Sequence, residues 1–339
     1  MTQETLVPID TGHIPHATET PIISVENLVK RYKKATKNAV DQISFSVAPG
    51  TLFALLGPNG SGKTTTISTL TTTLAPTSGT IRIAGYDLAT QAHLIRSQIG
   101  IIFQKPSLDL NLTAEENIRL HATLYGLYPY RPLFRLMPKT YRAQVQELAH
   151  LLGIEESLFK PVKTFSGGMK RKLEIVRSLL HRPEVLFLDE PTTGLDPESR
   201  RELWDHLRQV RAESGTTIFL TTHYLEEAEG ADNILIINRG QIVSAGSPQQ
   251  IKTSLTQPML FIDAHEREQL RVELRAKNID FKEDGHFSIA LENQQVHQLL
   301  KSIDTPLSMV QTHTPSLEDA YIHIIKQEYI EEQTEGHTK

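Results

Sequence analysis

Five short apolar runs recur between residues 52 and 237, and longer segments with helical signals separate most of them. They occupy residues 52–56, 99–103, 184–188, 217–221 and 233–237. Continuous apolar runs of this length are typical of strands that are buried on both faces, as in parallel sheets. Helices are predicted at residues 64–74, 90–97, 139–152, 166–181 and 197–214. This order predicts an α/β fold with a mostly parallel sheet that is covered by helices.

Other segments carry different signals. Val40, Ile43, Phe45 and Val47 alternate with polar residues, which predicts a half-buried antiparallel strand. Further strands are expected at 22–29 and 80–84, and a hairpin at 233–243. The segment 113–116 has the pattern of a capping box and predicts the start of another helix.

The pattern changes after about residue 255. Strands are predicted at 259–262, 279–281, 287–291 and 308–312, with helices at 266–277, 295–303 and 316–329. The order βαββαβ is typical of a ferredoxin-like domain. We therefore expect a mobile N-terminal tail (1–20), a nucleotide-binding domain (21–255), a small α+β accessory domain (256–330) and a tail (331–339).

A phosphate-binding loop is predicted between the first apolar run and the helix that follows it. It matches the pattern G-x-x-x-x-G-K-[ST] and consists of Gly57, Pro58, Asn59, Gly60, Ser61, Gly62, Lys63 and Thr64, followed by Thr65. Glycines let the backbone N–H groups point inward, and the helix N-terminus adds a positive dipole. We expect Lys63 to neutralise the outer phosphates and the hydroxyl of Thr64 to ligate Mg²⁺.

Two acidic residues, Asp189 and Glu190, end the apolar run at 184–188. One carboxylate there can hold the hydration shell of Mg²⁺, and the next can polarise an attacking water. A solvated acidic pair would give the same local pattern, but the upstream phosphate loop favours the nucleotide site.

The chain resembles the ATP-binding subunit of an ABC transporter over residues 22–252. Residues 164–169 (TFSGGM) are similar to the signature segment of that family, 189–197 (DEPTTGLDP) to its second nucleotide motif and the loop after it, and 221–223 (TTH) to its switch histidine. Gln104 and Tyr32 match the family's conserved glutamine and its adenine-stacking aromatic. The signature has Phe165-Ser166 at its start and Met169 at its end, a variant that resembles the branch of daunorubicin-resistance-type exporters. Residues 316–321 (SLEDAY) in the second domain resemble the same branch.

The resemblance implies specific roles. Glu190 would be the general base and His223 would hold the γ-phosphate, while Thr64, Gln104 and Asp189 would face Mg²⁺. Ser166, Gly167, Gly168 and Asp196 would complete the ATP site, with Ser166 and Gly168 contacting the ATP of an opposite subunit. It also implies a head-to-tail pair of two copies and a separate membrane-spanning permease. The antiparallel β and helical subdomains of the family are expected around the parallel sheet.

Composition excludes several classes of function. The net charge is −5, so no basic field favours nucleic acid, and the absence of cysteine excludes disulfides and thiolate metal sites. No run of eighteen apolar residues predicts a membrane span, and the N-terminus lacks the pattern of a signal peptide. A cytoplasmic protein, peripheral on the membrane through its permease, is expected.

Two questions remain open at the level of sequence. The proline-broken, apolar and basic segment 128–138 fits either a buried loop or a docking surface for the permease. The leading function is an ATPase motor of an exporter of drugs, antibiotics, polysaccharides or lipids. The alternatives are an ABC ATPase that is not coupled to transport and a nucleotide-binding regulator that no longer hydrolyses ATP, against which the intact Glu190 and His223 argue.

Overall fold

The computed structural model describes residues 20–322, except for 256–257, 292–295 and 314–315. The chain forms two compact units, Met1–Gly246 and Ser247–Lys339. The division lies nine residues before the boundary expected from the sequence, so that α8 (Pro248–Leu255) belongs to the second unit. Within the described residues, no helix is long and apolar enough to cross a membrane. The expected tails lie outside the described residues, apart from residue 20.

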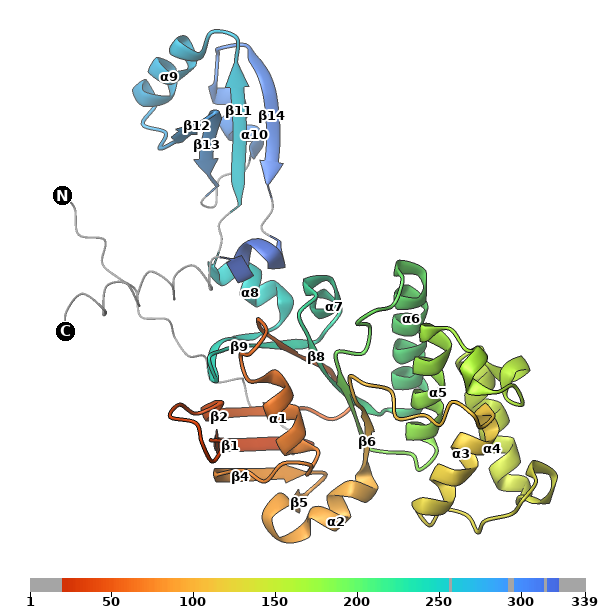
Figure 1. Cartoon of the computed structure of the whole chain (residues 1–339). Helices are drawn as coiled ribbons and strands as arrows, with labels where there is room; N and C mark the ends of the chain where they lie inside the picture. The colour runs from red at the N-terminus through yellow and green to blue at the C-terminus, as the bar shows by residue number, and fades with distance from the viewer. Residues whose placement is uncertain (1–19, 256–257, 292–295, 314–315, 323–339) are drawn as a thin grey trace. The chain divides into compact units, whose positions relative to one another are not determined.

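A six-stranded sheet forms the centre of the first unit, in the order β10-β9-β3-β8-β7-β6 (Figure 1). Its strands are β3 (Leu52–Leu56), β6 (Ile99–Ile102), β7 (Val185–Asp189), β8 (Thr217–Thr222), β9 (Asn233–Asn238) and β10 (Gln241–Gly246). All neighbours are parallel except β9 and β10, and every residue of β3, β7 and β8 is buried. The predicted mostly parallel sheet is confirmed. Parallel strands also bring the segments after β3, β7 and β8 to one edge of the sheet.

A second, antiparallel sheet packs in the same unit. It has the order β2-β1-β4-β5 and contains β1 (Ile23–Lys30), β2 (Val40–Val47), β4 (Ser78–Ile83) and β5 (Tyr86–Asp87). Its apolar residues form one core with those of the central sheet. The stacked rings of Phe45, Phe53 and Phe219 join the two sheets, with centroids 5.7 Å and 5.2 Å apart along the series.

Two helices accompany these sheets, α1 (Lys63–Leu70) and α2 (Leu88–Gln98). The helix α1 is shorter than the predicted 64–74. It ends because the hydroxyl of Thr71 bonds the carbonyl of Ile67 and Thr72 adopts a left-handed φ of 61°. Local bonds from threonine side chains compete in this way with helix continuation.

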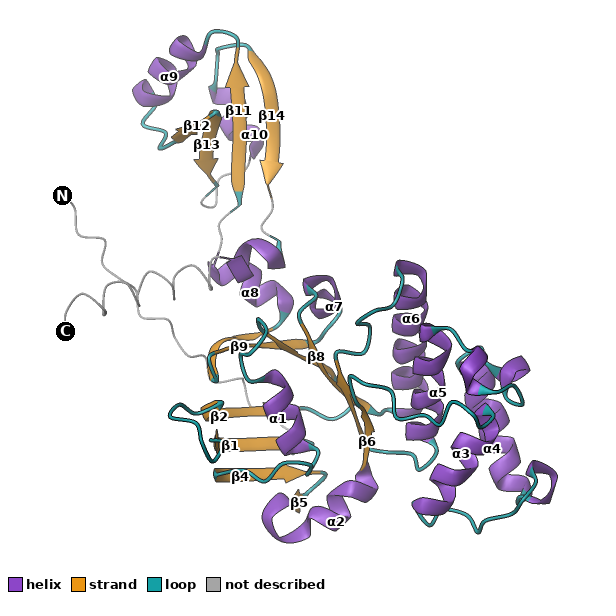
Figure 2. Cartoon of the chain, viewed as in Figure 1, coloured by secondary structure: helices purple, strands orange, loops and turns teal. Residues whose placement is uncertain are grey.

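The segment between β6 and α5 consists of helices and loops, with one isolated antiparallel bridge between Thr113 and Pro161 (Figure 2). Helices of this region and after it are α3 (Ala114–Leu124), α4 (Lys139–Leu151), α5 (Gly167–Leu179), α6 (Pro197–Ser214) and α7 (Leu225–Glu229), with short 3₁₀ turns at Phe134–Leu136, Glu155–Ser157 and Val162–Thr164. The predicted capping box is confirmed, because Thr113 and Glu116 bond each other's backbone N–H groups. α5 and α6 lie on the face of the central sheet opposite α1 (Figure 1).

The second unit contains a ferredoxin-like sheet of order β12-β13-β11-β14 with antiparallel neighbours throughout. Its elements are β11 (Met259–Ala264), α9 (Arg267–Ala276), β12 (Lys282–Asp284), β13 (His286–Ala290), α10 (Val296–Ser302) and β14 (Leu307–His313). The fold class is confirmed, but the strand predicted at 279–281 is wrong. Ile279 and Phe281 pack into the core as loop residues, and the tight turn at Gly285, with a φ of 72°, pairs β12 with β13 instead. Residues 317–322 are helical, and the rest of the predicted last helix lies outside the described residues.

Candidate active site

The phosphate-binding loop connects β3 to α1 and requires glycine for steric reasons. A Cβ atom on Gly57 would lie 2.2 Å from the carbonyl oxygen of Ile237, and one on Gly62 would lie 2.6 Å from that of Ala39. Gly62 also has a φ of 113°, which side chains disfavour. No side chain caps the N-terminus of α1. The backbone N–H groups and the dipole of this helix end therefore suit an anionic ligand.

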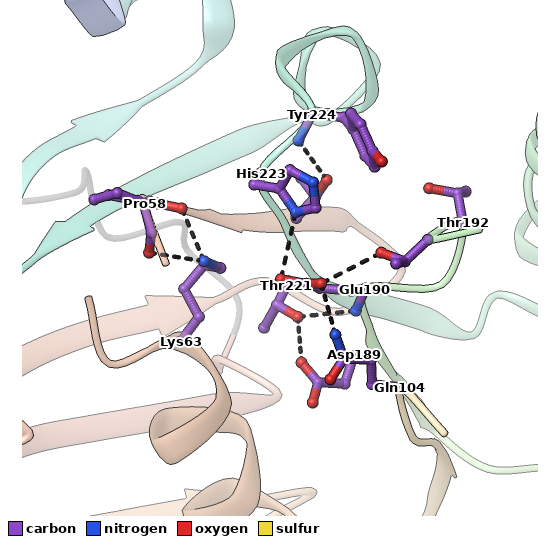
Figure 3. A network of polar contacts seen from close by, with 12 residues as sticks. Pro58, Lys63, Gln104, Asp189, Glu190, Thr192, Thr221, His223 and Tyr224 are labelled. Atoms are coloured by element: carbon purple, nitrogen blue, oxygen red, sulfur yellow. Dashed lines mark hydrogen bonds and ion pairs between the residues drawn. The ribbon is translucent and has the colours of Figure 1, made fainter. Parts of the chain in front are cut away.

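Lys63 is the first residue of α1 and is almost completely buried. Its ammonium group donates to the carbonyl oxygens of Gly57 at 2.8 Å and Pro58 at 3.0 Å (Figure 3). Burial lowers the pKa of Lys63, and the charges of Glu190 and Asp189 act in the opposite direction. A cation buried mainly against carbonyl oxygens gains much from a multivalent anion nearby.

Asp189 is the last residue of β7 and is buried beside β8. Its Oδ1 accepts the hydroxyl of Thr221 at 2.6 Å. Burial raises the pKa of Asp189, and the bond from Thr221 opposes this shift. A bound cation would stabilise the charged form of this carboxylate, which burial disfavours, and Oδ2 can accept a further partner. Asp189 therefore fits the role of a cation ligand.

Glu190 lies at the centre of a cluster of polar side chains (Figure 3). Its Oε2 accepts from the amide of Gln104 at 3.0 Å and from the hydroxyl of Thr193 at 3.3 Å, and its Oε1 lies 3.4 Å from Nδ1 of His223. The backbone of Glu190 has a φ of 45°, in the left-handed region. Its N–H group is held by the hydroxyl and the carbonyl of Thr221. Such strain costs about 1–3 kcal/mol and is concentrated at functional sites.

The remaining predicted residues fall into two groups. Thr64 and Tyr32 are exposed beside the loop, and the hydroxyl of Tyr32 lies 3.2 Å from that of Thr65. Ser166 and Asp196 instead make local contacts at helix starts. Ser166 caps α5 through the N–H of Met169 and Asp196 caps α6 through that of Ser199.

The glycines of the signature segment differ in their surroundings. Gly167 is exposed, whereas Gly168 is buried. A Cβ atom on Gly168 would lie 2.9 Å from Oγ of Ser199, so α5 and α6 approach each other closely at this point.

Arg171 is a residue of this region that the sequence reasoning missed. It is buried in α5 and donates to the carbonyls of Phe103, Pro191 and Asp189 and to the carboxylate of Glu174. It therefore ties the ends of β6 and β7 to α5. The Arg171–Glu174 pair, spaced i, i+3, was the available signal, although α5 also carries Lys170, Lys172 and Arg177.

Thr221 is a second residue whose role the sequence did not reveal. It donates to Asp189 and accepts from the N–H group of Glu190. A threonine directly after the apolar residues 218–220 of a buried strand was the available signal, because a buried hydroxyl needs partners.

The chain is similar to known proteins over most of its length. A family model described as "ABC transporter" matches residues 40–193. Nod factor export ATP-binding protein I of Ralstonia nicotianae is 42% identical over 240 residues, which cover 70% of this chain and 71% of that protein. The daunorubicin/doxorubicin resistance ATP-binding protein DrrA of Streptomyces peucetius is 38% identical over 248 residues, which cover 73% and 72%.

The similarity also extends into the second unit. Nod factor export ATP-binding protein I of Paraburkholderia xenovorans is 35% identical over 311 residues, which cover 90% of this chain and 97% of that protein. Among solved structures, an ATP-binding subunit of an ABC transporter is 32% identical, with a TM-score of 0.59 over 69% of this chain and 92% of that one. The chain therefore belongs to the ATP-binding subunits of ABC transporters, in the branch of the daunorubicin-resistance and Nod-factor-export proteins, and it is an ABC-type ATPase.

Proposed function

We propose that the chain is the ATP-hydrolysing motor of an exporter and that Glu190 is its general base. The observation that carries the proposal is the arrangement around Glu190. Its carboxylate is held by Gln104, Thr193 and His223 at the sheet edge where the phosphate loop also begins. Relatives named for Nod factor export and for daunorubicin/doxorubicin resistance support export as the direction of transport.

The phosphates of ATP are bound by the loop N–H groups and by Lys63, whose ammonium now donates to loop carbonyls. Tyr32 stacks on the adenine. The donor set of Thr64, Gln104 and Asp189 fits Mg²⁺, because one buried carboxylate with neutral oxygens suits an ion that is shared with substrate phosphates. When bound there, Mg²⁺ would neutralise charge on the phosphate oxygens.

In the proposed reaction, Glu190 accepts a proton from the attacking water while the oxygen of that water bonds to the γ-phosphorus. The bond from that phosphorus to the β–γ bridging oxygen breaks, and ADP leaves with the electron pair. His223 donates a hydrogen bond to the γ-phosphate and keeps the water in line. Positioning of this kind, with an electrostatically prepared site, accounts for most catalysis of phosphoryl transfer.

The complete site requires a second copy of the chain. Ser166 and Gly168 lie at the N-terminus of α5, where Ser166 and its neighbour Gly167 are exposed. In a head-to-tail pair, this helix end meets the γ-phosphate of the ATP bound by the other copy. ATP then favours the closed pair, and hydrolysis removes that preference.

A separate membrane permease is the second partner. The segment 128–138 is mostly exposed, including Tyr130, Leu133 and Leu136, which favours docking over a buried loop. Met137 and the half-buried Phe134 anchor it, and the ring of Phe134 lies 6.1 Å from that of Tyr141.

Glu190→Gln tests the proposal. The amide keeps the shape of the side chain but cannot accept the proton, and removal of a general base typically costs about 10²–10⁴ in rate. We expect hydrolysis to fall by at least about a hundredfold, while ATP binding survives and an ATP-dependent dimer appears in light scattering. The matched control is Glu184→Gln, an exposed change just before the opposite end of β7. Near-normal hydrolysis by Glu190→Gln would place the base elsewhere.

A further inference from the structure

Glu227 is a buried carboxylate that the proposed reaction does not use. It lies in α7, just after the switch histidine, and is 4% exposed. Its Oε1 accepts the hydroxyl of Thr192, and its Oε2 accepts the hydroxyl of Thr222 at 2.6 Å. Both threonines are themselves buried. Glu227 therefore bridges the loop after Glu190 to the end of β8.

Each end of this bridge adjoins a contact of the Glu190 carboxylate. On one side, Thr192 precedes Thr193, whose hydroxyl donates to Glu190 at 3.3 Å. On the other side, Thr222 precedes His223, whose Nδ1 lies 3.4 Å from Glu190. The bridge thus joins the two chain segments that hold the carboxylate from opposite sides.

The bridge also reaches the ring of His223 by a second route. The hydroxyl of Thr222 accepts from the N–H group of Tyr224 at 2.9 Å. The rings of Tyr224 and His223 are 4.1 Å apart between centroids, and the guanidinium of Arg200 covers Tyr224 at 4.4 Å (Figure 3 shows the two rings). The backbone that carries His223 and the ring beside it are therefore both fixed by Thr222.

The chemistry of the bridge explains why a hydrogen-bond acceptor is needed at this position. The hydroxyl of Thr222 is buried, and its oxygen accepts the N–H group of Tyr224, so its hydrogen needs a separate acceptor within the protein. Hydrogen bonds to a carboxylate are shorter and roughly twice as strong as neutral ones. An apolar residue would leave two buried hydroxyls without this acceptor, at a cost for each.

We propose that Glu227 is a positioning residue for ATP hydrolysis. It holds His223 in place relative to Glu190 by locking the segment 192–193 to the segment 222–224. This inference rests on the proposed roles of Glu190 and His223, and it adds a residue that touches neither ATP nor the attacking water.

The test compares Glu227→Ala and Glu227→Gln in the full chain, each in the natural background and together with His223→Ala. Single-turnover hydrolysis of radiolabelled ATP gives the rate, and equilibrium binding gives the Kd. We expect Glu227→Ala to slow hydrolysis by at least about tenfold, because small misplacements of catalytic groups have effects of this size or larger. The Kd should stay within about twofold, since Lys63 and its loop are untouched.

Two comparisons separate positioning from stability alone. Glu227→Gln should keep the rate within about threefold, because its oxygen can accept from Thr222 while its amide donates to a rotated Thr192 hydroxyl. In the His223→Ala background, Glu227→Ala should lower the hydrolysis rate by less than about a further twofold. If Glu227 acts by positioning His223, its removal has little left to disturb once that histidine is absent. If Glu227→Ala does not fold, Thr192→Val, which cuts one end of the bridge, serves in the same comparison.

The matched control is Thr216→Val, which removes a buried hydroxyl just before the opposite end of β8. It should lower the melting temperature without changing the rate. An equal loss from Glu227→Ala in both backgrounds, or a normal rate in the natural background, would overturn the inference. If His223→Ala hydrolyses ATP slowly but Glu227→Ala hydrolyses it at the normal rate, only the inference about Glu227 fails. If His223→Ala itself hydrolyses ATP at the normal rate, the proposed role of His223 fails, and the inference fails with it.

Discussion

At the residue scale, two histidines are held within the packing of α3 on α5. His121 lies in the last turn of α3, and its ring centroid is 4.2 Å from that of Tyr125, which is 5.2 Å from that of His181. Burial lowers the pKa of His121 to about 3, and the charges of Arg177 and His181 act in the same direction. This side chain is therefore neutral in the folded protein at ordinary pH.

The shift predicts a pH dependence of stability. In the unfolded chain His121 binds a proton below its ordinary pKa of 6.5, whereas in the folded protein it stays neutral down to about pH 3. Its contribution is thus complete above pH 6.5 and is lost as the pH falls from there towards 3. We expect His121→Gln to reduce the slope of unfolding free energy against pH in this window by up to about 1.4 kcal/mol per pH unit.

Chemical denaturation followed by the fluorescence of Trp204 measures this slope. His93→Gln, which changes an exposed histidine of α2, is the matched control. An unchanged slope in His121→Gln would mean that the buried ring takes up a proton in the folded state.

At the element scale, the segment 128–138 shows how a proline-broken stretch divides its apolar residues. Tyr128 and Phe134 pack edge-to-face on the buried Tyr141 of α4, whereas Tyr130 and Leu133 are 58% and 45% exposed. Rigid anchoring of exposed apolar groups favours an interface, because these groups lose less conformational freedom when a partner binds.

Replacement of Tyr130 and Leu133 by serine is expected to weaken capture of the permease from detergent-solubilised membranes by at least about tenfold, since exposed anchors of this kind contribute about 1–2 kcal/mol or more each. ATP affinity of the isolated subunit should not change. The control pair is Val272→Ser with Ile322→Ser, which removes exposed apolar groups of the second unit. A collapse of ATP binding together with folding would show that the segment is core.

At the scale of the whole molecule, the proposed site is divided between copies. Lys63 and Glu190 lie at the sheet edge, whereas Ser166 lies at the start of α5 and caps its own helix. Two copies in a head-to-tail pair would form two composite sites, each with Lys63 from one copy and Ser166 from the other. Symmetric closure of this kind needs both surfaces on every chain.

Mixing two defective chains tests this division. Lys63→Ala alone should not bind ATP, and Ser166→Arg alone should bind ATP but place a long cation at the contact with the other copy. An equimolar mixture contains pairs with one intact composite site. Steady-state hydrolysis by the mixture should therefore exceed the average of the two chains assayed separately, by severalfold. Activity equal to that average would contradict a shared site.

The sequence by itself determined the local elements of this protein. Apolar runs and glycine spacing were enough to predict β3, β7 and β8 and the loop at Gly57–Lys63, because burial on both faces and a phosphate-binding turn leave strong local patterns. The ferredoxin-like order of the second unit followed in the same way. The expected roles of Gln104 and His223 came from resemblance to a family, whereas the role of Glu190 was also expected from its place after Asp189 at the end of an apolar run.

Only the tertiary structure decided which side chains meet. Gln104 and Glu190 are 86 positions apart, and the parallel pairing of β6 with β7 brings them within 3.0 Å. Arg171 gained the carbonyls of Phe103 and Asp189, and Glu227 the hydroxyl of Thr192, in the same way. No local pattern distinguishes a buried glutamate in a short helix from an exposed one. Periodicity records how each residue faces its own element, whereas contacts between elements depend on packing that is distributed over the whole chain.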